Sequence, residues 1–162
     1  MKLVVQRVSE AEVRVDGEVV GRIGQGMLVL LGVMKGDTEV QVQRLAERLA
    51  HFRFFPDAEG RMNLSVLDEG LGVLVVSQFT LAADGRKGRR PSFDRAAPPD
   101  LALSLYEAFV SQLKSRGLEV ATGRFRTEMQ VHLVGDGPAT FVLEEPPLAA
   151  TGGGHESSQV DS

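Results

Sequence analysis

The chain has 162 residues, of which 43% are hydrophobic and 25% charged, and its formal net charge is −4 at pH 7. This length and composition predict a single globular domain with its own hydrophobic core and argue against a disordered or fibrous protein. The sequence contains no cysteine, which excludes disulfides, a thiolate nucleophile and cysteine-bound zinc.

The first third of the chain is predicted to form strands separated by turns. Aliphatic and β-branched residues dominate the segments 2–8, 11–15, 18–23 and 27–33. Asp16-Gly17, between the second and third segments, is a strong signal for a two-residue hairpin. We therefore expect an antiparallel meander here.

A helix is expected next, with Asp37 as a candidate N-cap, because apolar residues recur at helical spacing as far as His51. Short strands are expected at 52–55 and 62–66, on either side of a turn. The segment 72–81 (GVLVVSQFTL) is the most hydrophobic of the predicted strands, which indicates a central place in the sheet.

A second helix is predicted to begin at Pro99 and to end before Gly117, which is typical of the residue that follows a helix. Its apolar stripe consists of Leu101, Leu105, Phe109 and Leu113. Further strands are expected at 118–122, 129–134 and 140–145. Residues 146–162 lack periodicity and are rich in Gly, Ser and Pro, so we expect a folded domain over 1–145 and a disordered tail after it.

These elements favour an α/β fold with mostly antiparallel strands and two main helices on one side of the sheet. Strict strand–helix alternation and the glycine-rich motifs GxGxxG and GxxxxGK[ST] are absent, which argues against a nucleotide-binding fold. The histidines have no metal-site spacing, and no apolar run approaches the roughly 20 residues of a membrane span. We expect a soluble, cytoplasmic protein without metal, cofactor or membrane partner.

The segment SQFTL (77–81) is the first candidate for chemistry. Ser, Gln and Thr are ordinary where a strand emerges into solvent, and that reading stays open. The alternative is that backbone N–H groups between Ser77 and Thr80 bind a developing oxyanion. Thr80 could also be a nucleophile, but its sequence neighbourhood contains no His, Asp or Glu to act as its base.

A basic segment lies between Asp84 and Arg95, in contrast to the acidic chain as a whole. Its central basic residues are Arg86, Lys87, Arg89 and Arg90. The segment is either a solvated loop or a contact for nucleic-acid phosphates, which glycines allow to approach closely. One such loop suits a terminus or a short stretch of nucleic acid.

The segment VGDGPATF (134–141) contains more special residues than a turn needs. A hairpin corner accounts for Gly135 and Asp136, whereas Gly137-Pro138 suggests a further role. Arg7 lies within an apolar strand, where it either faces solvent or needs an anion or carbonyl partner.

Together these segments resemble the D-aminoacyl-tRNA deacylases, also called D-tyrosyl-tRNA deacylases. The motifs that carry the resemblance, in order, are VVQRV, MLVLLGV, RMNLSV, SQFTL, GRRPSF, TGRF with MQVHLV, and DGPATF. They extend over about residues 1–145, and SQ-x-T together with GP-x-T is a specific pair. The resemblance implies a homodimer of β/β/α-layered subunits that hydrolyses the ester joining a D-amino acid, or glycine, to the 3′ end of tRNA.

The resemblance also implies roles for individual residues. The backbone amides of Phe79 and Thr80 would hold the carbonyl oxygen, and the 2′-OH of the terminal ribose would help to activate water. Ser77 and Gln78 would shape the pocket, and Met129 would contact the terminal adenine. The remaining implied roles are a cis peptide at Gly137 and Pro138 that reaches into the partner's pocket and excludes L-amino acids, support of that loop by Arg7, and acceptor-stem phosphate contacts at Arg86, Lys87, Arg89 and Arg90.

Two departures from the family pattern bear on these roles. Arg126-Thr127 stands where the family usually has small residues, which either alters the contacts to the adenosine or adds a phosphate contact. Ala139 replaces the commoner valine of GP-x-T. The alternatives to the deacylase are a tRNA-binding module without catalysis and an esterase with Thr80 as nucleophile.

Overall fold

The computed structural model describes residues 1–148 and has a mixed α/β fold of one domain, as expected from the sequence. The strands of the main sheet are β1 (Lys2–Val15), β2 (Glu18–Ile23), β3 (Gly26–Gly32), β6 (Gly72–Ser77), β7 (Glu119–Thr122) and β8 (Gln130–Glu144). A small second sheet contains β4 (Phe55–Pro56) and β5 (Met62–Leu64). The helices are α1 (Glu39–His51), α2 (Val66–Glu69), the 3₁₀ helix η1 (Phe79–Ala82) and α3 (Pro99–Ser115).

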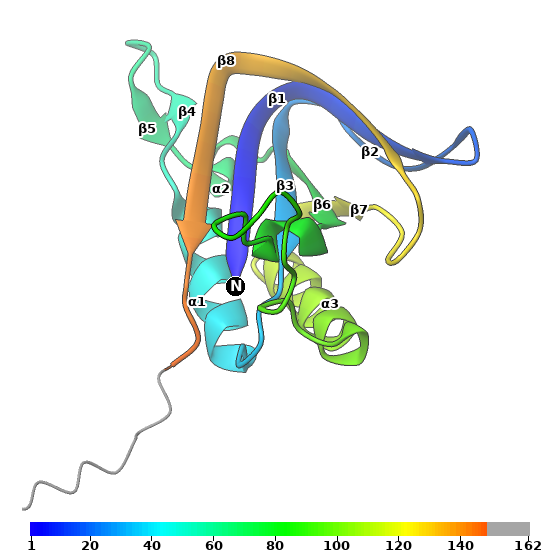
Figure 1. The fold of residues 1–162 in the computed structure, drawn as a ribbon. Helices are drawn as coiled ribbons and strands as arrows, with labels where there is room; N and C mark the ends of the chain where they lie inside the picture. The colour runs from blue at the N-terminus through cyan, green and yellow to red at the C-terminus, as the bar shows by residue number, and fades with distance from the viewer. Residues whose placement is uncertain (149–162) are drawn as a thin grey trace, which may run out of the picture.

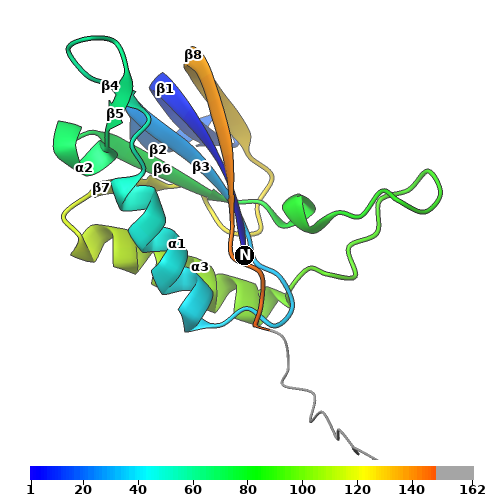
Figure 2. The same ribbon diagram turned by 90° about the vertical axis from the view of Figure 1, so that its left-hand side faces the viewer.

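The central strands β3 and β6 are buried on both faces. Alternate residues of these strands, such as Val29 and Val75, pack in the core beneath α1 and α3, which lie side by side on one face of the sheet (Figure 2). The residues between them, such as Leu28 and Leu74, pack in a second core with β2 and the second half of β1. The continuous hydrophobic runs of these strands follow from this two-sided burial.

Strand β1 is continuous, whereas two strands were predicted from the sequence over 2–8 and 11–15. Its first half supplies Leu3 and Val5 to the core beneath the helices, and its second half supplies Ala11 and Val13 to the other core. The strand curves between these halves, and β8 curves with it (Figure 1). The polar residues between the two apolar segments therefore mark a change of layer within one strand.

The predicted meander is also wrong in its pairing. Strand β3 pairs with β1 and not with β2, so that β1 lies between them. The next neighbours, β3 with β6 and β6 with β7, are parallel. Parallel neighbours need long connections, which α1 and α3 provide.

Strand β8 replaces the two predicted strands at 129–134 and 140–145. It is antiparallel to β1, with Gln6 opposite Thr140 and Val8 opposite Gly135. Residues 136–139 therefore bulge out of the ladder opposite Arg7 alone. VGDGPATF is thus a bulge within a strand and not a hairpin corner, and its Gly137-Pro138 peptide is cis.

The N-cap of α1 is Thr38 and not Asp37. The Thr38 hydroxyl accepts a hydrogen bond from the amide of Val40, and the Gln41 side chain accepts one from the Thr38 amide. The Asp37 carboxylate is buried and pairs with the Met1 ammonium at 2.8 Å, while it also accepts the Met34 amide. The residue next to the predicted cap therefore anchors the first strand.

Several predicted boundaries shift. The strand predicted at 72–81 ends at Ser77, and the chain continues as η1. The strand predicted at 52–55 is replaced by β4 at Phe55–Pro56, and the strand predicted at 62–66 ends at Leu64 because Ser65 caps the short helix α2. Of the predicted tail, the Pro146 carbonyl accepts a hydrogen bond from Gln41, and residues 149–162 lie outside the described part of the chain.

Gly21 of β2 is expected to be intolerant of a side chain. A Cβ atom at Gly21 would lie 2.2 Å from the backbone oxygen of Thr122 in β7, so that β2 would have to move away. We expect Gly21→Ala to lower the free energy of unfolding by at least about 2 kcal/mol, measured by urea denaturation. Gly24→Ala is the matched control, because a Cβ at Gly24 has no neighbour within 4 Å. Equal urea midpoints for the two variants would contradict this close approach.

Candidate active site

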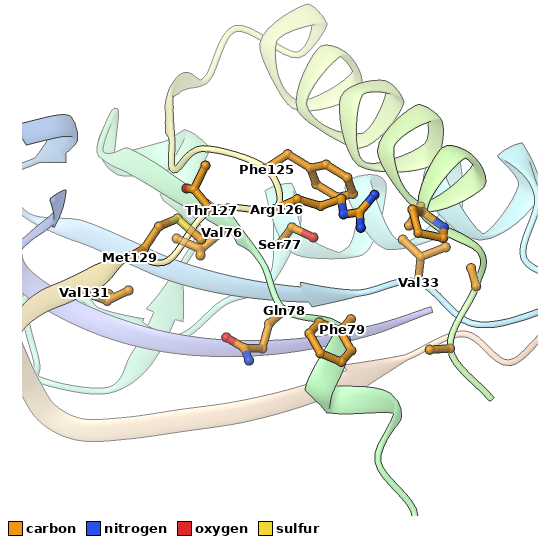
Figure 3. A pocket seen from close by; sticks show the side chains of 14 residues that line it. Val33, Val76, Ser77, Gln78, Phe79, Phe125, Arg126, Thr127, Met129 and Val131 are labelled. Carbon is orange, nitrogen blue, oxygen red and sulfur yellow. The ribbon is translucent and has the colours of Figure 1, made fainter. Parts of the chain in front are cut away.

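A cavity of about 570 Å³ opens at the carboxyl end of β6 (Figure 3). Its walls come from the end of β6, from the start of α3, and from the loop between β7 and β8. The lining residues are Val33, Val76, Ser77, Gln78, Phe79, Ala96, Ala97, Pro99, Ala102, Phe125, Arg126, Thr127, Met129 and Val131. The cavity is of the size and mainly apolar character of a small-molecule site.

The sequence-predicted residues Ser77, Gln78 and Phe79 form one wall of this cavity, and Met129 lies on the β8 side. The Gln78 amide continues the sheet by donating to the Leu31 carbonyl at 2.7 Å, and the chain then turns into η1. Within residues 1–148, no hydrogen bond is donated by the amides of Phe79 and Thr80. These amides are the first two of a helical turn, where the backbone itself provides no acceptor.

The Thr80 side chain is held locally. Its hydroxyl oxygen accepts a hydrogen bond from the side-chain Nε2 of Gln78, and Thr80 is exposed outside the cavity wall. The fourteen lining residues include neither a carboxylate nor an imidazole. The cavity can therefore offer backbone donors and apolar surface to a ligand, but its lining has no side chain suited to act as a general base.

Ten lining residues were not among the predicted site residues, and three of these, Phe125, Arg126 and Thr127, lie in the loop before β8. The Phe125 ring stacks on Tyr106 with 5.9 Å between the ring centroids. The Tyr106 hydroxyl donates to the Val75 carbonyl, and burial raises the pKa of this phenol, so it stays neutral. The sequence signal that could have identified Phe125 was its place in the TGRF motif. Its contact with α3 depends on the tertiary fold and is not visible in the sequence.

The loop before β8 is ordered by its own hydrogen bonds. The Arg124 amide donates to the Met129 sulfur at 3.4 Å, and the Thr127 hydroxyl donates to the Arg124 carbonyl at 2.9 Å. Met129 also packs against Gly123, where a Cβ atom would lie 2.8 Å from the sulfur. Met129 thus contributes to the cavity and fixes the loop that carries Phe125 and Arg126.

The basic segment forms a loop that leaves η1 and returns at the start of α3, extending away from the body of the domain (Figure 2). Both ends of the loop adjoin the cavity, and the Phe93 ring of the loop packs on the lining residue Phe79, with 5.2 Å between the ring centroids. The Arg86 guanidinium pairs with the Asp84 carboxylate and holds the pKa of that group well below its usual range. Within residues 1–148, the exposed side chains of Lys87, Arg89 and Arg90 have no carboxylate partner.

Arg7 fastens the bulge of β8 to the domain. Its guanidinium donates to the carbonyls of Asp136 at 3.0 Å and Phe54 at 2.7 Å. The Arg7 side chain is only 11% exposed, so these carbonyls supply the partners that its burial requires. The sequence left open whether Arg7 faces solvent or bonds to an anion or carbonyl group, and in the structure Arg7 points inward to these carbonyls.

Gly137 and Pro138 do not line the cavity of their own chain. They are exposed at the bulge of β8, which pairs with β1 along one edge. Exposed apolar residues of the same strand are Val131, Leu133, Val134 and Val142. The structure therefore separates the predicted site residues into a cavity group and a bulge group.

The described residues, 1–148, also bear on metal binding and membrane insertion. No cluster of three or more His, Asp or Glu side chains there could hold a metal ion. In the same range, no helix has both the length and the apolar character needed to cross a bilayer.

The chain is similar to known deacylases over nearly all of its length. The family model of D-Tyr-tRNA(Tyr) deacylase matches residues 4–144. A D-aminoacyl-tRNA deacylase from Geobacter metallireducens is 59% identical, covering 94% of this chain and 100% of the relative. Another from Syntrophotalea carbinolica is 60% identical, covering 89% of this chain and 97% of the relative.

Solved structures agree with the fold. The c-Myc DNA unwinding element binding protein superposes with a TM-score of 0.85 at 40% identity, covering 90% of this chain and 99% of that one. A probable eukaryotic D-amino acid tRNA deacylase shares the fold with a TM-score of 0.76 at 17% identity, covering 88% of this chain and 98% of that one. The match to the family model and the identity to full-length relatives have the same consequence: the chain belongs to the D-Tyr-tRNA(Tyr) deacylase family.

Proposed function

We propose that the protein is a D-aminoacyl-tRNA deacylase, which hydrolyses the ester between a D-amino acid and the 3′-terminal adenosine of tRNA. The observation that carries this proposal is the cavity at the end of β6, with the amides of Phe79 and Thr80 beside it and no carboxylate or imidazole in its lining. Family membership supports this substrate class, and the cavity has the size and apolar character of a small-molecule site, to which we assign the terminal nucleotide of the tRNA.

The amides of Phe79 and Thr80 stabilise the oxyanion of the reaction. Water adds to the ester carbonyl, and the negative charge that develops on the carbonyl oxygen is met by these two donors. The 2′-OH of the terminal ribose assists in removing a proton from water. The intermediate then expels the ribose 3′-oxygen, which takes up a proton, and the free D-amino acid leaves.

Chirality is selected by position and not by affinity for the side chain. D- and L-aminoacyl esters differ only in the exchange of hydrogen and side chain at Cα. A rigid backbone segment at the place of an L side chain excludes it, whereas D-amino acids and glycine still fit. We assign this segment to Gly137 and Pro138, with Arg7 holding it through the Asp136 carbonyl.

The proposed enzyme is a homodimer in which the bulge of one chain enters the cavity of the other. Gly137 and Pro138 are exposed and do not line their own cavity. Strand β8 also carries exposed apolar residues next to the bulge, including Leu133 and Val134. An edge strand with an apolar surface is suited to an interface between copies of one chain.

The basic loop contacts phosphates near the 3′ end of the tRNA. Replacing Arg89 and Arg90 by glutamine is expected to reduce the slope of log affinity against log salt by about 1.4 to 1.8, because each phosphate contact contributes roughly 0.7 to 0.9. Filter binding of tRNA at several salt concentrations measures this slope. Arg86→Gln should reduce it less, because Asp84 already neutralises Arg86. Unchanged slopes for the double variant would remove the loop from the interface.

The proposed function is tested by comparing D-Tyr-tRNA with L-Tyr-tRNA. We expect the protein to release tyrosine from the D ester and to leave the L ester largely intact. Release is followed as acid-soluble radiolabelled tyrosine, with spontaneous hydrolysis subtracted. Tight binding of both esters without release would instead identify a tRNA-binding module, and equal hydrolysis of both would identify an esterase without chiral selection.

A further inference from the structure

We propose that Arg126 is a binding residue for the phosphate on the 5′ side of the terminal adenosine, an inference that rests on the proposed function. Arg126 is the charged residue among the fourteen that line the cavity. It is exposed, and within residues 1–148 its guanidinium has neither a carboxylate partner nor a hydrogen bond. A guanidinium in this setting can bind an anion that enters with the ligand.

The backbone of Arg126 indicates that this placement is specific. Its φ is +56°, in the left-handed region that glycine adopts more readily than arginine. The neighbouring contacts hold it there, because the Thr127 hydroxyl bonds to the Arg124 carbonyl and the Arg124 amide bonds to the Met129 sulfur. In Figure 3 the Arg126 side chain extends beside the Phe125 ring, within the cavity wall.

The chemistry of the substrate selects the phosphate. An aminoacyl ester of adenosine carries one cation, the amino acid ammonium, which a guanidinium repels. The anionic group nearest to the terminal nucleoside is its 5′ phosphodiester, whose oxygens match the planar donors of arginine. Arg126 therefore orients the substrate, with the phosphate at the Arg126 side and the ammonium away from it.

The position of Arg126 in the cavity distinguishes its proposed role from that of the basic loop. Arg89 and Arg90 lie on the extended loop outside the cavity lining, so they would contact phosphates elsewhere on the tRNA. Arg126 would contact the phosphate of the nucleotide that occupies the cavity itself. A mononucleotide bound in the cavity would then reach Arg126 but would be too short to contact the basic loop.

The test compares adenosine with adenosine 5′-monophosphate as competitive inhibitors of D-Tyr-tRNA hydrolysis. We expect the wild-type enzyme to bind the monophosphate about tenfold more tightly than adenosine, an effect typical of a charge-assisted hydrogen bond. Arg126→Gly removes the guanidinium and suits the φ of +56°, and it should abolish this preference. Arg126→Lys should retain part of it. Raising the salt concentration should reduce the wild-type preference.

Two controls separate Arg126 from general electrostatics. Arg124→Gln removes an exposed guanidinium two residues away that does not line the cavity, and it should leave the preference unchanged. The Arg89→Gln and Arg90→Gln double variant should also keep it. A wild-type enzyme without the preference, or an Arg126→Gly variant that keeps it, would overturn the proposal.

The failure of the proposed function would be seen separately. If the wild-type protein does not hydrolyse D-Tyr-tRNA, the same two nucleotides are compared by calorimetric binding. A monophosphate preference that Arg126→Gly abolishes then supports the phosphate site in a binding protein. Equal affinities for the two nucleotides would reject the phosphate site, whatever the activity of the protein.

Discussion

Replacing Gly137 by alanine is expected to lower the rate of D-Tyr-tRNA hydrolysis by at least about 100-fold, the cost of displacing a positioning group by about 1 Å. The φ of Gly137 is +136°, which side chains rarely adopt. A Cβ atom there would lie 2.8 Å from the Ala139 nitrogen and 2.9 Å from the Arg7 Nη2. The bulge must therefore move, and with it the segment to which we assign chiral selection.

Gly135→Ala is the matched control for this prediction. Gly135 lies two residues earlier on the same strand, and a Cβ atom there would meet nothing within 4 Å. We expect Gly135→Ala to keep at least half of the activity. Thermal unfolding of both variants shows whether the domain remains folded. A folded Gly137→Ala enzyme with the wild-type rate and wild-type rejection of L-Tyr-tRNA would exclude the bulge from the site.

Mixing two inactive variants tests whether each site uses both chains. Ala102→Phe places a large ring in the cavity wall and should block it, whereas Gly137→Ala damages the bulge. A mixed dimer would contain one site with an open cavity and an intact bulge. After unfolding and refolding together, we expect roughly a quarter of the wild-type activity, as random pairing gives in a two-fold dimer. No recovery in mixed dimers would place the bulge outside the partner's cavity.

Removing the 2′-OH of the terminal adenosine is expected to slow hydrolysis by about 10² to 10⁴, the usual contribution of a group that transfers a proton. The physical reason is that the cavity lining contains no carboxylate or imidazole to replace it. The measurement uses tRNA ending in 2′-deoxyadenosine and charged with D-tyrosine on the 3′-OH. Single-turnover rates avoid a contribution from product release.

Thr80→Val is the matched change on the protein, because it removes the hydroxyl and nearly preserves the shape. We expect it to retain activity within about tenfold, since the Thr80 hydroxyl accepts a bond from Gln78 and its amide is unaffected. Binding of tRNA and thermal unfolding serve as checks on the fold. A complete loss of activity in this variant, together with full activity on the 2′-deoxy substrate, would instead assign the nucleophile to Thr80.

Much of the fold could be predicted from local patterns. The helix from Pro99 with its stripe at Leu105, Phe109 and Leu113 was expected and is observed, with Gly117 in the left-handed conformation that ends it. The hairpin at Asp16-Gly17 is confirmed by positive φ values at both residues. These features depend on neighbours within a few residues, which the sequence displays directly.

The errors concern partners that are distant along the chain. Asp37 was assigned as a cap because its type suits one, but the structure pairs it with the ammonium of Met1. The hairpin corner predicted at Gly135 and Asp136 is instead part of a bulge within β8, which only the ladder with Gln6 and Val8 reveals. Local sequence patterns do not identify which distant group a residue contacts in the folded chain.

The candidate site, like the fold, could be predicted from the sequence only in part. Ser77, Gln78, Phe79 and Met129 were named through the resemblance, and they share one cavity although about fifty residues separate them. The structure adds Phe125, and it places in the same cavity Arg126, which the sequence marked only as a departure from the family pattern. The positions of both residues depend on the stacking with Tyr106 and on the turn at 124–127. The chain also places Gly137 at a bulge outside this cavity, which the sequence could not locate.

The amides beside the cavity have a consequence for how the protein tolerates mutation. Phe79 is 60% exposed and Thr80 is exposed, so most substitutions there change the surface and leave the backbone N–H groups in place. Among the encoded residues, only proline lacks that donor. In a saturation library selected for activity, both codons should therefore accept varied side chains and exclude proline, so sequence variability at these positions would conceal their importance.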